Sequence, residues 1–379
     1  MVAVLYGLAA LIWMALGREI VPGRWFGLHL FTLGMLSNLV MAFTDHFART
    51  LLHSEVARGP ASRPLVLNAG VLLVLVGLPS DLPIVVGVGA TLATAAVMWL
   101  YLDLRRLRRR SLTGRFAFVL RGYERACGAF VHGALLGLLM GVGVLSGGWH
   151  GAARLAHMHV NLLGWGGLTL LATIVFFGPT VLRRRIEPGA EAVAASALRW
   201  ASTGLSAAAL SLLLTGAGAP FDTWLRVAAG VGLLIYAWAT TRIWLPVARV
   251  ATNAAGSLER LLVLFAGGWF VVVAWTDAVV VTIGAWRVLD ALGAALLLGV
   301  LLQAIVGALA YLGPMVRGRT PAARAAMRGR LQRLASAKVA VLNLGVAIIA
   351  AMSITGASTT GGWLLIALAV VLIAWPLAR

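Results

Sequence analysis

The stretch "ARLAHMHVNLLGWGGLTLLATIVFFGPTVLRRR", residues 153–185, places His157 and His159 at the start of a long apolar run. About twenty consecutive apolar residues are enough for a helix to cross the hydrocarbon core of a bilayer. An imidazole in such a helix costs free energy unless a partner satisfies its nitrogens. The stretch therefore predicts a membrane-spanning helix whose outer end presents histidines to a partner elsewhere in the chain.

The composition of the chain is that of an integral membrane protein. Of its 379 residues, 61% are hydrophobic and only 11% are charged, and no soluble globule of this size buries so much apolar surface. The net charge of +19 comes from arginines in short connectors between apolar runs, where they act as orientation signals, so no nucleic-acid partner is predicted. The single Cys127 excludes an internal disulfide and a cysteine-based metal cluster.

The apolar runs predict a single polytopic domain over residues 1–379, an all-α membrane bundle of about twelve transmembrane helices. The predicted spans are 2–17, 26–48, 64–79, 83–103, 124–148, 153–182, 194–215, 222–247, 258–283, 287–316, 338–355 and 361–378. Connectors after even-numbered spans are rich in arginine, whereas those after odd-numbered spans carry almost none. The positive-inside rule then predicts a multi-pass protein of a bacterial plasma membrane with both termini in the cytoplasm.

This orientation sorts the histidines by depth. The second and sixth spans run from outside to inside, so His29, His157 and His159 lie near the outer face, with His150 just above them. An inner layer lies about 25 Å deeper and consists of His46, His53, His132, Asp45 and Glu124. All seven histidines precede residue 160, so the second half of the chain contributes no imidazole.

Three spans share a sequence pattern. The sixth and tenth spans match at an offset of 135, which aligns Leu162, Leu163, Gly164, Gly178, Pro179 and Val181 with Leu297, Leu298, Gly299, Gly313, Pro314 and Val316. The second span joins them because "HLFTLG" from His29 and "HVNLLG" from His159 have the same histidine-to-glycine spacing. The following spans also match, as "VLNAGV" around Asn68 and "VLNLGV" around Asn343. The pattern predicts a pseudo-threefold bundle of three related four-span units.

The repeat puts His29 and His159 at equivalent positions of two helices and at one depth. Helices of a bundle core present axial ligands to a metal or haem in this way, whereas the third equivalent position is Ala294. His159 is predicted to face inward with His29, and His157 to serve the other side or to support a ligand, since residues two apart point about 200° from each other. The glycine five residues beyond each histidine leaves room for a flat macrocycle or for a close helix.

In these features the chain resembles subunit I of the haem–copper oxidases and the related NnrS membrane proteins. The segments "LHLFTLGMLSNLVMAFTDHFA", "AHMHVNLLGWGGLTLL" and "LLQAIVGALAYLGPMV" are more similar still to the membrane domain that precedes some bacterial copper oxidases of the nitrite-reductase type. The resemblance implies b-type haem or copper bound by histidines, and a role in electron transfer or in respiratory nitrogen-oxide chemistry.

The chain also departs from that family. Proteins of the subunit I type carry a histidine near the middle of the sixth span, a histidine pair on the seventh and several histidines on the tenth, which together hold two haems and a copper. Here the seventh span reads "ALRWASTGLSAAALSLLL" and the tenth has no histidine. The chain is therefore not expected to assemble a complete oxygen-reducing centre, and at most one haem or one or two copper sites are predicted.

The candidate ligands are His29, His157 and His159, with His132 as a further metal ligand, and each has a simpler interpretation. The outer histidines can hydrogen-bond headgroups, water or backbone at the interface. His132 has apolar neighbours in sequence and can be a buried, hydrogen-bonded imidazole. Asp277, the one carboxylate embedded in a span, can carry protons or pair with an arginine such as Arg287 or Arg154.

Two further classes of function remain open. One is a redox-inert transporter or permease with a histidine-lined polar pathway. The other is a membrane anchor that docks a periplasmic copper oxidase. The predicted partners are the lipid bilayer, a periplasmic copper protein or electron donor, and a second copy of the chain in a homo-oligomer. No catalytic residue is predicted.

Overall fold

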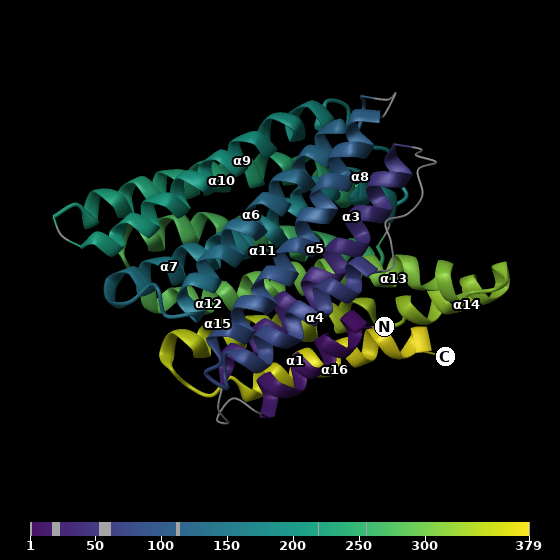
Figure 1. Cartoon of the computed structure of the whole chain (residues 1–379). Helices are drawn as coiled ribbons and strands as arrows, with labels where there is room; N and C mark the ends of the chain where they lie inside the picture. Colours follow the sequence, from purple (N-terminus) through teal and green to yellow (C-terminus); the bar gives the residue numbers. More distant parts are fainter. Residues whose placement is uncertain are drawn as a thin grey trace. The chain divides into compact units, whose positions relative to one another are not determined.

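The computed structural model describes residues 2–16, 23–52, 62–110, 114–218, 220–254 and 256–378. Every element in this part of the chain is helical, and it contains no strand (Figure 1). His53, which was predicted to lie in the inner layer, falls outside the described residues. The all-α class predicted from the sequence is confirmed.

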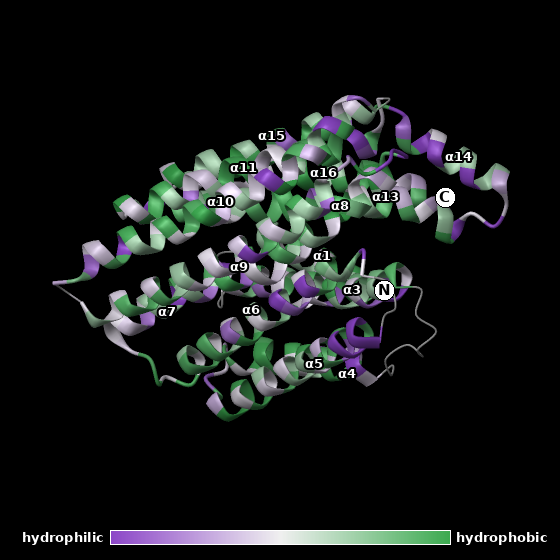
Figure 2. Ribbon diagram, turned by 90° about the horizontal axis from the view of Figure 1, so that it is seen from above, coloured by the Kyte–Doolittle hydropathy of each residue, from purple (hydrophilic) through white to green (hydrophobic). Residues whose placement is uncertain are grey.

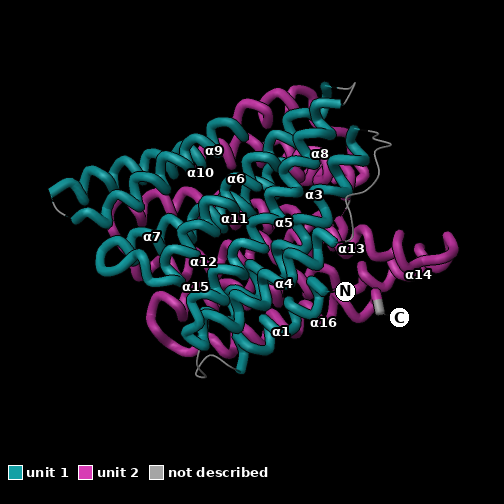
Figure 3. Tube along the Cα trace, in the orientation of Figure 1, with its two compact units in different colours: residues 1–172, 198–236 teal, residues 173–197, 237–379 magenta. Residues whose placement is uncertain are grey.

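The helices form two compact units, residues 1–172 with 198–236 and residues 173–197 with 237–379 (Figure 3). Up to the first boundary the elements are α1 (Val2–Leu16), α2 (Arg24–His29), η1 (Leu30–Leu36), α3 (Ser37–Leu51), α4 (Ser62–Gly77), α5 (Pro83–Arg110), α6 (Ala117–Gly141), α7 (Gly147–His159) and η2 (Val160–Leu168). The helices α8 (Thr169–Val181), α9 (Ala190–Leu214) and α10 (Asp222–Thr252) contribute residues to both units, and η3 (Thr215–Ala217) follows α9. The second unit continues with α11 (Leu258–Ile283), η4 (Trp286–Val288), α12 (Leu289–Ala294), η5 (Ala295–Leu302), α13 (Gln303–Arg317), α14 (Pro321–Gln332), α15 (Ala335–Thr355) and α16 (Thr360–Ala378).

Within the described residues, nine continuous helices are long and apolar enough to cross a membrane. They are Arg24–Leu51, Pro83–Arg110, Gly147–Val181, Ala190–Ala217, Asp222–Thr252, Leu258–Ile283, Trp286–Arg317, Ala335–Thr355 and Thr360–Leu377. Hydrophobic residues run along these helices, whereas α14 is largely hydrophilic (Figure 2). The protein is therefore a multi-pass membrane protein in contact with lipid. The three other predicted spans correspond to α1, α4 and α6, and the count of twelve stays a prediction.

Three of the long helices contain a π-helical segment, and each segment begins directly after an aligned position of the sequence repeat. The segment η1 follows His29, η2 follows His159, and η5 follows Ala294. A π-helical turn holds an extra residue relative to an α-helical turn and changes the direction of the side chains that follow it. The same backbone irregularity thus occurs at the three places that the sequence pattern aligned.

The glycine in each π-helical segment allows a neighbouring helix to approach closely. A Cβ added at Gly34 would lie 2.6 Å from the Tyr6 ring of α1. At Gly164 it would lie 2.5 Å from the Ala129 Cβ of α6, and at Gly299 it would lie 2.8 Å from the Trp269 ring of α11. Close helix packing, one of the two uses predicted for the glycines at positions 34 and 164, is what the structure shows there.

A second repeated feature is a pair of side-chain amides that joins the π-containing helix to a neighbouring helix. In the first unit, Asn38 and Asn68 exchange hydrogen bonds of 3.0 and 2.9 Å, and Asn38 also donates to the Gly34 carbonyl over 2.8 Å. In the second unit, Gln303 and Asn343 exchange hydrogen bonds of 3.0 and 3.3 Å, and Gln303 donates to the Gly299 carbonyl over 2.8 Å. Each pair satisfies polar groups that would otherwise face apolar surroundings.

Candidate functional site

His29 lies at the end of α2, and two contacts to Trp25 fix its ring. The imidazole Nδ1 donates a hydrogen bond of 2.9 Å to the Trp25 carbonyl oxygen, one helical turn earlier. The indole of Trp25 stacks on the imidazole with ring centroids 4.2 Å apart and planes inclined by 26°. Because a carbonyl oxygen only accepts, Nδ1 carries the proton and the neutral ring keeps a lone pair at Nε2.

His157 lies near the end of α7, and the shortest contact of its ring is with α6, while the Asn161 side-chain nitrogen lies 3.3 Å from its Nδ1. Its Nδ1 donates a hydrogen bond of 2.8 Å to the carbonyl oxygen of Gly133. The absence of a side chain at Gly137 makes room for the ring, since a Cβ there would lie 2.9 Å from the His157 Cε1. This imidazole is therefore also protonated at Nδ1, which leaves a lone pair at Nε2.

The rings of His29 and His157 lie close to each other within the first unit. Their centroids are 6.4 Å apart and their planes are inclined by 22°. The sequence repeat predicted that His159 would be the inward partner of His29, but the ring that meets His29 belongs to His157. His159 is buried, with 5% of its surface exposed, and its Nδ1 donates to the Leu155 carbonyl over 2.7 Å.

The separation of the His29 and His157 rings is close to the largest that one shared metal ion allows. Two imidazoles that each bind one ion through a nitrogen at about 2.0–2.1 Å have ring centroids at most roughly 6 Å apart, because a ring nitrogen lies about 1 Å from its centroid. Histidines that bind metals almost always donate their other ring N–H to a backbone carbonyl or a carboxylate. Both imidazoles make such a bond.

The number of ligands restricts which group the pair can hold. Among the described residues, no three or more histidine, cysteine, aspartate or glutamate side chains come together as a metal site. A tetrahedral zinc site built from four such side chains is therefore not formed there. Two imidazoles suit a haem iron, whose remaining ligands come from the macrocycle, or a copper ion of low coordination number.

The other predicted site residues lie outside this pair. His46, His132 and His150 are exposed. The neighbours of His132 in sequence suggested a buried imidazole, but the side chain lies on an open face of α6, with its Nδ1 bonded to the Gly128 carbonyl over 2.8 Å. Residues that are adjacent in sequence point in different directions around a helix, so apolar neighbours do not show which face of the helix is covered by other helices. Asp277 is buried in α11 of the second unit, with 6% of its surface exposed.

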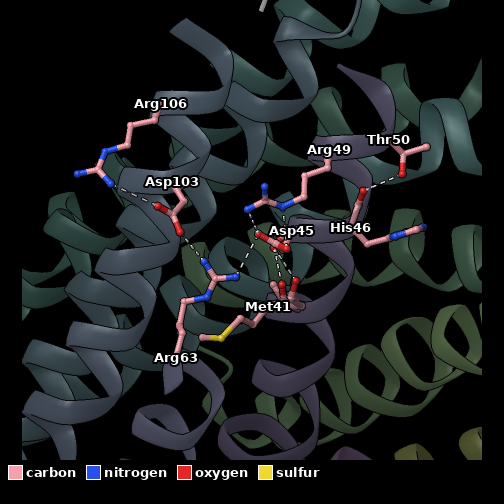
Figure 4. A network of polar contacts seen from close by, with 10 residues as sticks. Met41, Asp45, His46, Arg49, Thr50, Arg63, Asp103 and Arg106 are labelled. Carbon is pink, nitrogen blue, oxygen red and sulfur yellow. Dashed lines mark hydrogen bonds and ion pairs between the residues drawn. The ribbon is translucent and has the colours of Figure 1, made fainter. Parts of the chain in front are cut away.

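A network of ion pairs joins α3, α4 and α5 in the first unit (Figure 4). Arg63, with its side chain 5% exposed, bridges Asp45 at 3.1 Å and Asp103 at 2.9 Å. Asp45 also pairs with Arg49 at 3.1 Å, and Asp103 with the exposed Arg106 at 3.7 Å. Asp45 was predicted to belong to an inner layer with His46, but the His46 ring points away from these carboxylates (Figure 4).

Sequence reasoning missed the groups that hold the two facing rings. Neither Trp25 nor Gly133 nor Asn161 was predicted to contact a histidine. Asn161 donates to the His157 carbonyl over 2.9 Å. The separation of four residues between Trp25 and His29, and between His157 and Asn161, is the spacing of helix neighbours and was a usable signal. The contact with Gly133 spans 24 residues and has no local signal.

Comparison with known proteins identifies no relative of this chain. No protein family matches the chain, and neither does any curated protein or solved structure. The fold defines the class as an all-helical, multi-pass membrane protein. Its function has to be inferred from the site itself.

Proposed function

We propose that the chain is a haem- or copper-binding membrane protein that holds its cofactor between His29 and His157 and acts in electron transfer or nitrogen-oxide chemistry. The observation that carries this proposal is the 6.4 Å separation of the two ring centroids. It gains support from the Nδ1 hydrogen bonds, which give both rings the tautomer needed to bind through Nε2.

The residues of the chain would bind and orient the group. His29 and His157 supply the two nitrogen lone pairs, and Trp25 and the Gly133 carbonyl hold the rings so that they do not rotate away. A bound haem or copper supplies reversible one-electron chemistry. The apolar helices around the pair exclude water and lower the local dielectric, and such surroundings control the redox potential of a metal site.

The proposed fold is a pseudo-threefold bundle of four-span units like that of haem–copper oxidase subunit I. The π-helical segments after His29, His159 and Ala294 and the two amide pairs support it. The second half of the chain has no histidine, so the proposal contains no complete oxygen-reducing centre. We further propose a bacterial plasma membrane with both termini inside, based on the arginines of the even-numbered connectors, and a periplasmic copper protein as electron donor.

Purification of the full-length protein tests the proposal. We expect a haem absorption band or one equivalent of copper per chain, and its loss in His29→Ala and in His157→Ala. His150→Ala is the matched control, because His150 is exposed and belongs to the same helix as His157. Its cofactor content is expected to equal that of the unchanged protein.

Two results would overturn the proposal. Protein that is colourless and free of metal, even after incubation with haem or copper(I), would favour a redox-inert transporter. A bound cofactor that persists when both His29 and His157 are replaced would place the site elsewhere. Each variant also needs the same elution volume in detergent as the unchanged protein, so that loss of cofactor is separated from loss of fold.

A further inference from the structure

A groove lies between α5 and α6 in the first unit, and neither His29 nor His157 lines it. It has a volume of about 600 Å³ and is open to the exterior. Its lining combines two kinds of side chain, cationic at one end and largely apolar at the other. The residues that matter here are Arg121, Arg125, Tyr101, Met98 and Val131.

The cationic end of the groove has more positive charge than its own acids neutralise. Arg108 donates two hydrogen bonds to Glu124, of 2.7 and 3.2 Å, so these two charges offset each other. Arg125 is half-buried and lies near the like charges of Arg121 and Arg199 as well as near Glu124. In the described part of the chain, neither Arg121 nor Arg125 has an ion-pair partner. Like charges held close together beside an apolar surface favour binding of an anion.

The groove has the polarity of a lipid-binding site. On α6, Arg121 and Arg125 lie among the first nine residues of the helix, and Val131 lies about 15 Å beyond Arg121 at about 1.5 Å per residue. On the oppositely directed α5, Met98 precedes Tyr101, and both precede the ion-paired Arg108. The arginines thus lie at the end of the groove where α5 ends and α6 begins, and the apolar side chains lie deeper along the helices.

We propose that this groove binds one anionic diacyl phospholipid. The phosphate lies against Arg121 and Arg125, and one acyl chain lies along Met98 and Val131. The Tyr101 hydroxyl accepts a hydrogen bond of 3.4 Å from Arg105 and can donate its own proton to an ester oxygen. Basic pockets between membrane helices are an established way for proteins to hold anionic lipid headgroups. A free phosphate ion would use only the cationic end and would leave the apolar end unfilled.

The test uses the full-length protein in nanodiscs that contain phosphatidylcholine and a small fraction of phosphatidylglycerol. Native mass spectrometry then counts the lipids that stay bound when the protein is released. We expect one retained phosphatidylglycerol per chain, and a loss of about tenfold or more in Arg121→Gln/Arg125→Gln, since each basic side chain near a lipid headgroup contributes measurably to binding. Arg121→Gln alone, at an exposed position, is expected to give an intermediate loss.

The matched control is Arg109→Gln/Arg110→Gln. It removes the same charge from the same end of the bundle, at two exposed residues that do not line the groove. Equal loss in this control would show that general surface charge holds the lipid. Equal retention of phosphatidylcholine, or displacement of the lipid by millimolar inorganic phosphate, would also overturn the proposal. None of these outcomes depends on a cofactor at His29 and His157.

Discussion

His29 and His157 lie on different helices, yet their rings stand 6.4 Å apart in nearly parallel planes. Each ring is held by a carbonyl oxygen, that of Trp25 for His29 and that of Gly133 for His157. Both tautomers are therefore set before any ligand binds. Ligands held in advance lose less conformational freedom on binding, which strengthens a site.

Replacement of His159 distinguishes between His157 and His159 as the second ligand beside His29. We expect His159→Ala to keep the full cofactor content, because the ring facing His29 belongs to His157. The variant should unfold more easily, since it loses a buried side chain and its hydrogen bond to Leu155. Cofactor content and the midpoint of thermal unfolding in detergent are the two measurements. Loss of cofactor without loss of stability would identify His159 as the ligand.

Trp25 is expected to position His29 through its ring. Trp25→Leu removes the stacking at 4.2 Å but keeps the backbone carbonyl that accepts from Nδ1. An aromatic pair contributes about 0.5–1.5 kcal/mol, so cofactor affinity should fall roughly two- to tenfold. Titration of the cofactor into stripped protein measures this change. Trp25→Phe keeps an aromatic ring and should restore most of the affinity, whereas equal losses in both variants would contradict the role of the ring.

Arg63 is expected to be the most sensitive residue of the ion-pair network. Arg63→Met leaves Asp45 and Asp103 without their shared partner. Removal of one partner from a buried ion pair costs about 3–5 kcal/mol, and the free energy of unfolding in mixed micelles should fall accordingly. Arg106 pairs with the same Asp103 at 3.7 Å but its side chain is 71% exposed, so Arg106→Met should cost less than about 1 kcal/mol. Similar losses for the two variants would show that Arg63 is solvated.

The two amide pairs should contribute similar coupling energies. Interhelical hydrogen bonds in membrane proteins average about 0.6 kcal/mol, with values up to about 1.7 kcal/mol. Double-mutant cycles of Asn38→Leu with Asn68→Leu and of Gln303→Leu with Asn343→Leu measure the two energies. We expect both to lie in this range and to agree within about 0.5 kcal/mol. A clear coupling in one pair and none in the other would argue against equivalent roles in a repeat.

The positions of the helices could be predicted from the sequence because each span depends on the length and hydrophobicity of one continuous segment. The predicted span 258–283 coincides with α11, and the predicted span 83–103 lies within the longer α5. The alignment of His29, His159 and Ala294 also identified where the three π-helical segments begin, although the irregularity itself was not predicted. The two partners of Arg63 were not predicted, because Asp45 and Asp103 lie 18 and 40 residues away from it and no local pattern joins them to it.

The sequence alone determined that this chain crosses a membrane many times. Whether a segment can span the bilayer depends on the length of one continuous apolar run relative to the thickness of the hydrocarbon core, and not on tertiary contacts. It also determined which helices carry histidines. Only the tertiary structure decided that His157, and not His159, faces His29. The rotation of a helix about its own axis depends on its neighbours, and here the carbonyl of Gly133 and the missing side chain of Gly137 on α6 draw the His157 ring into place.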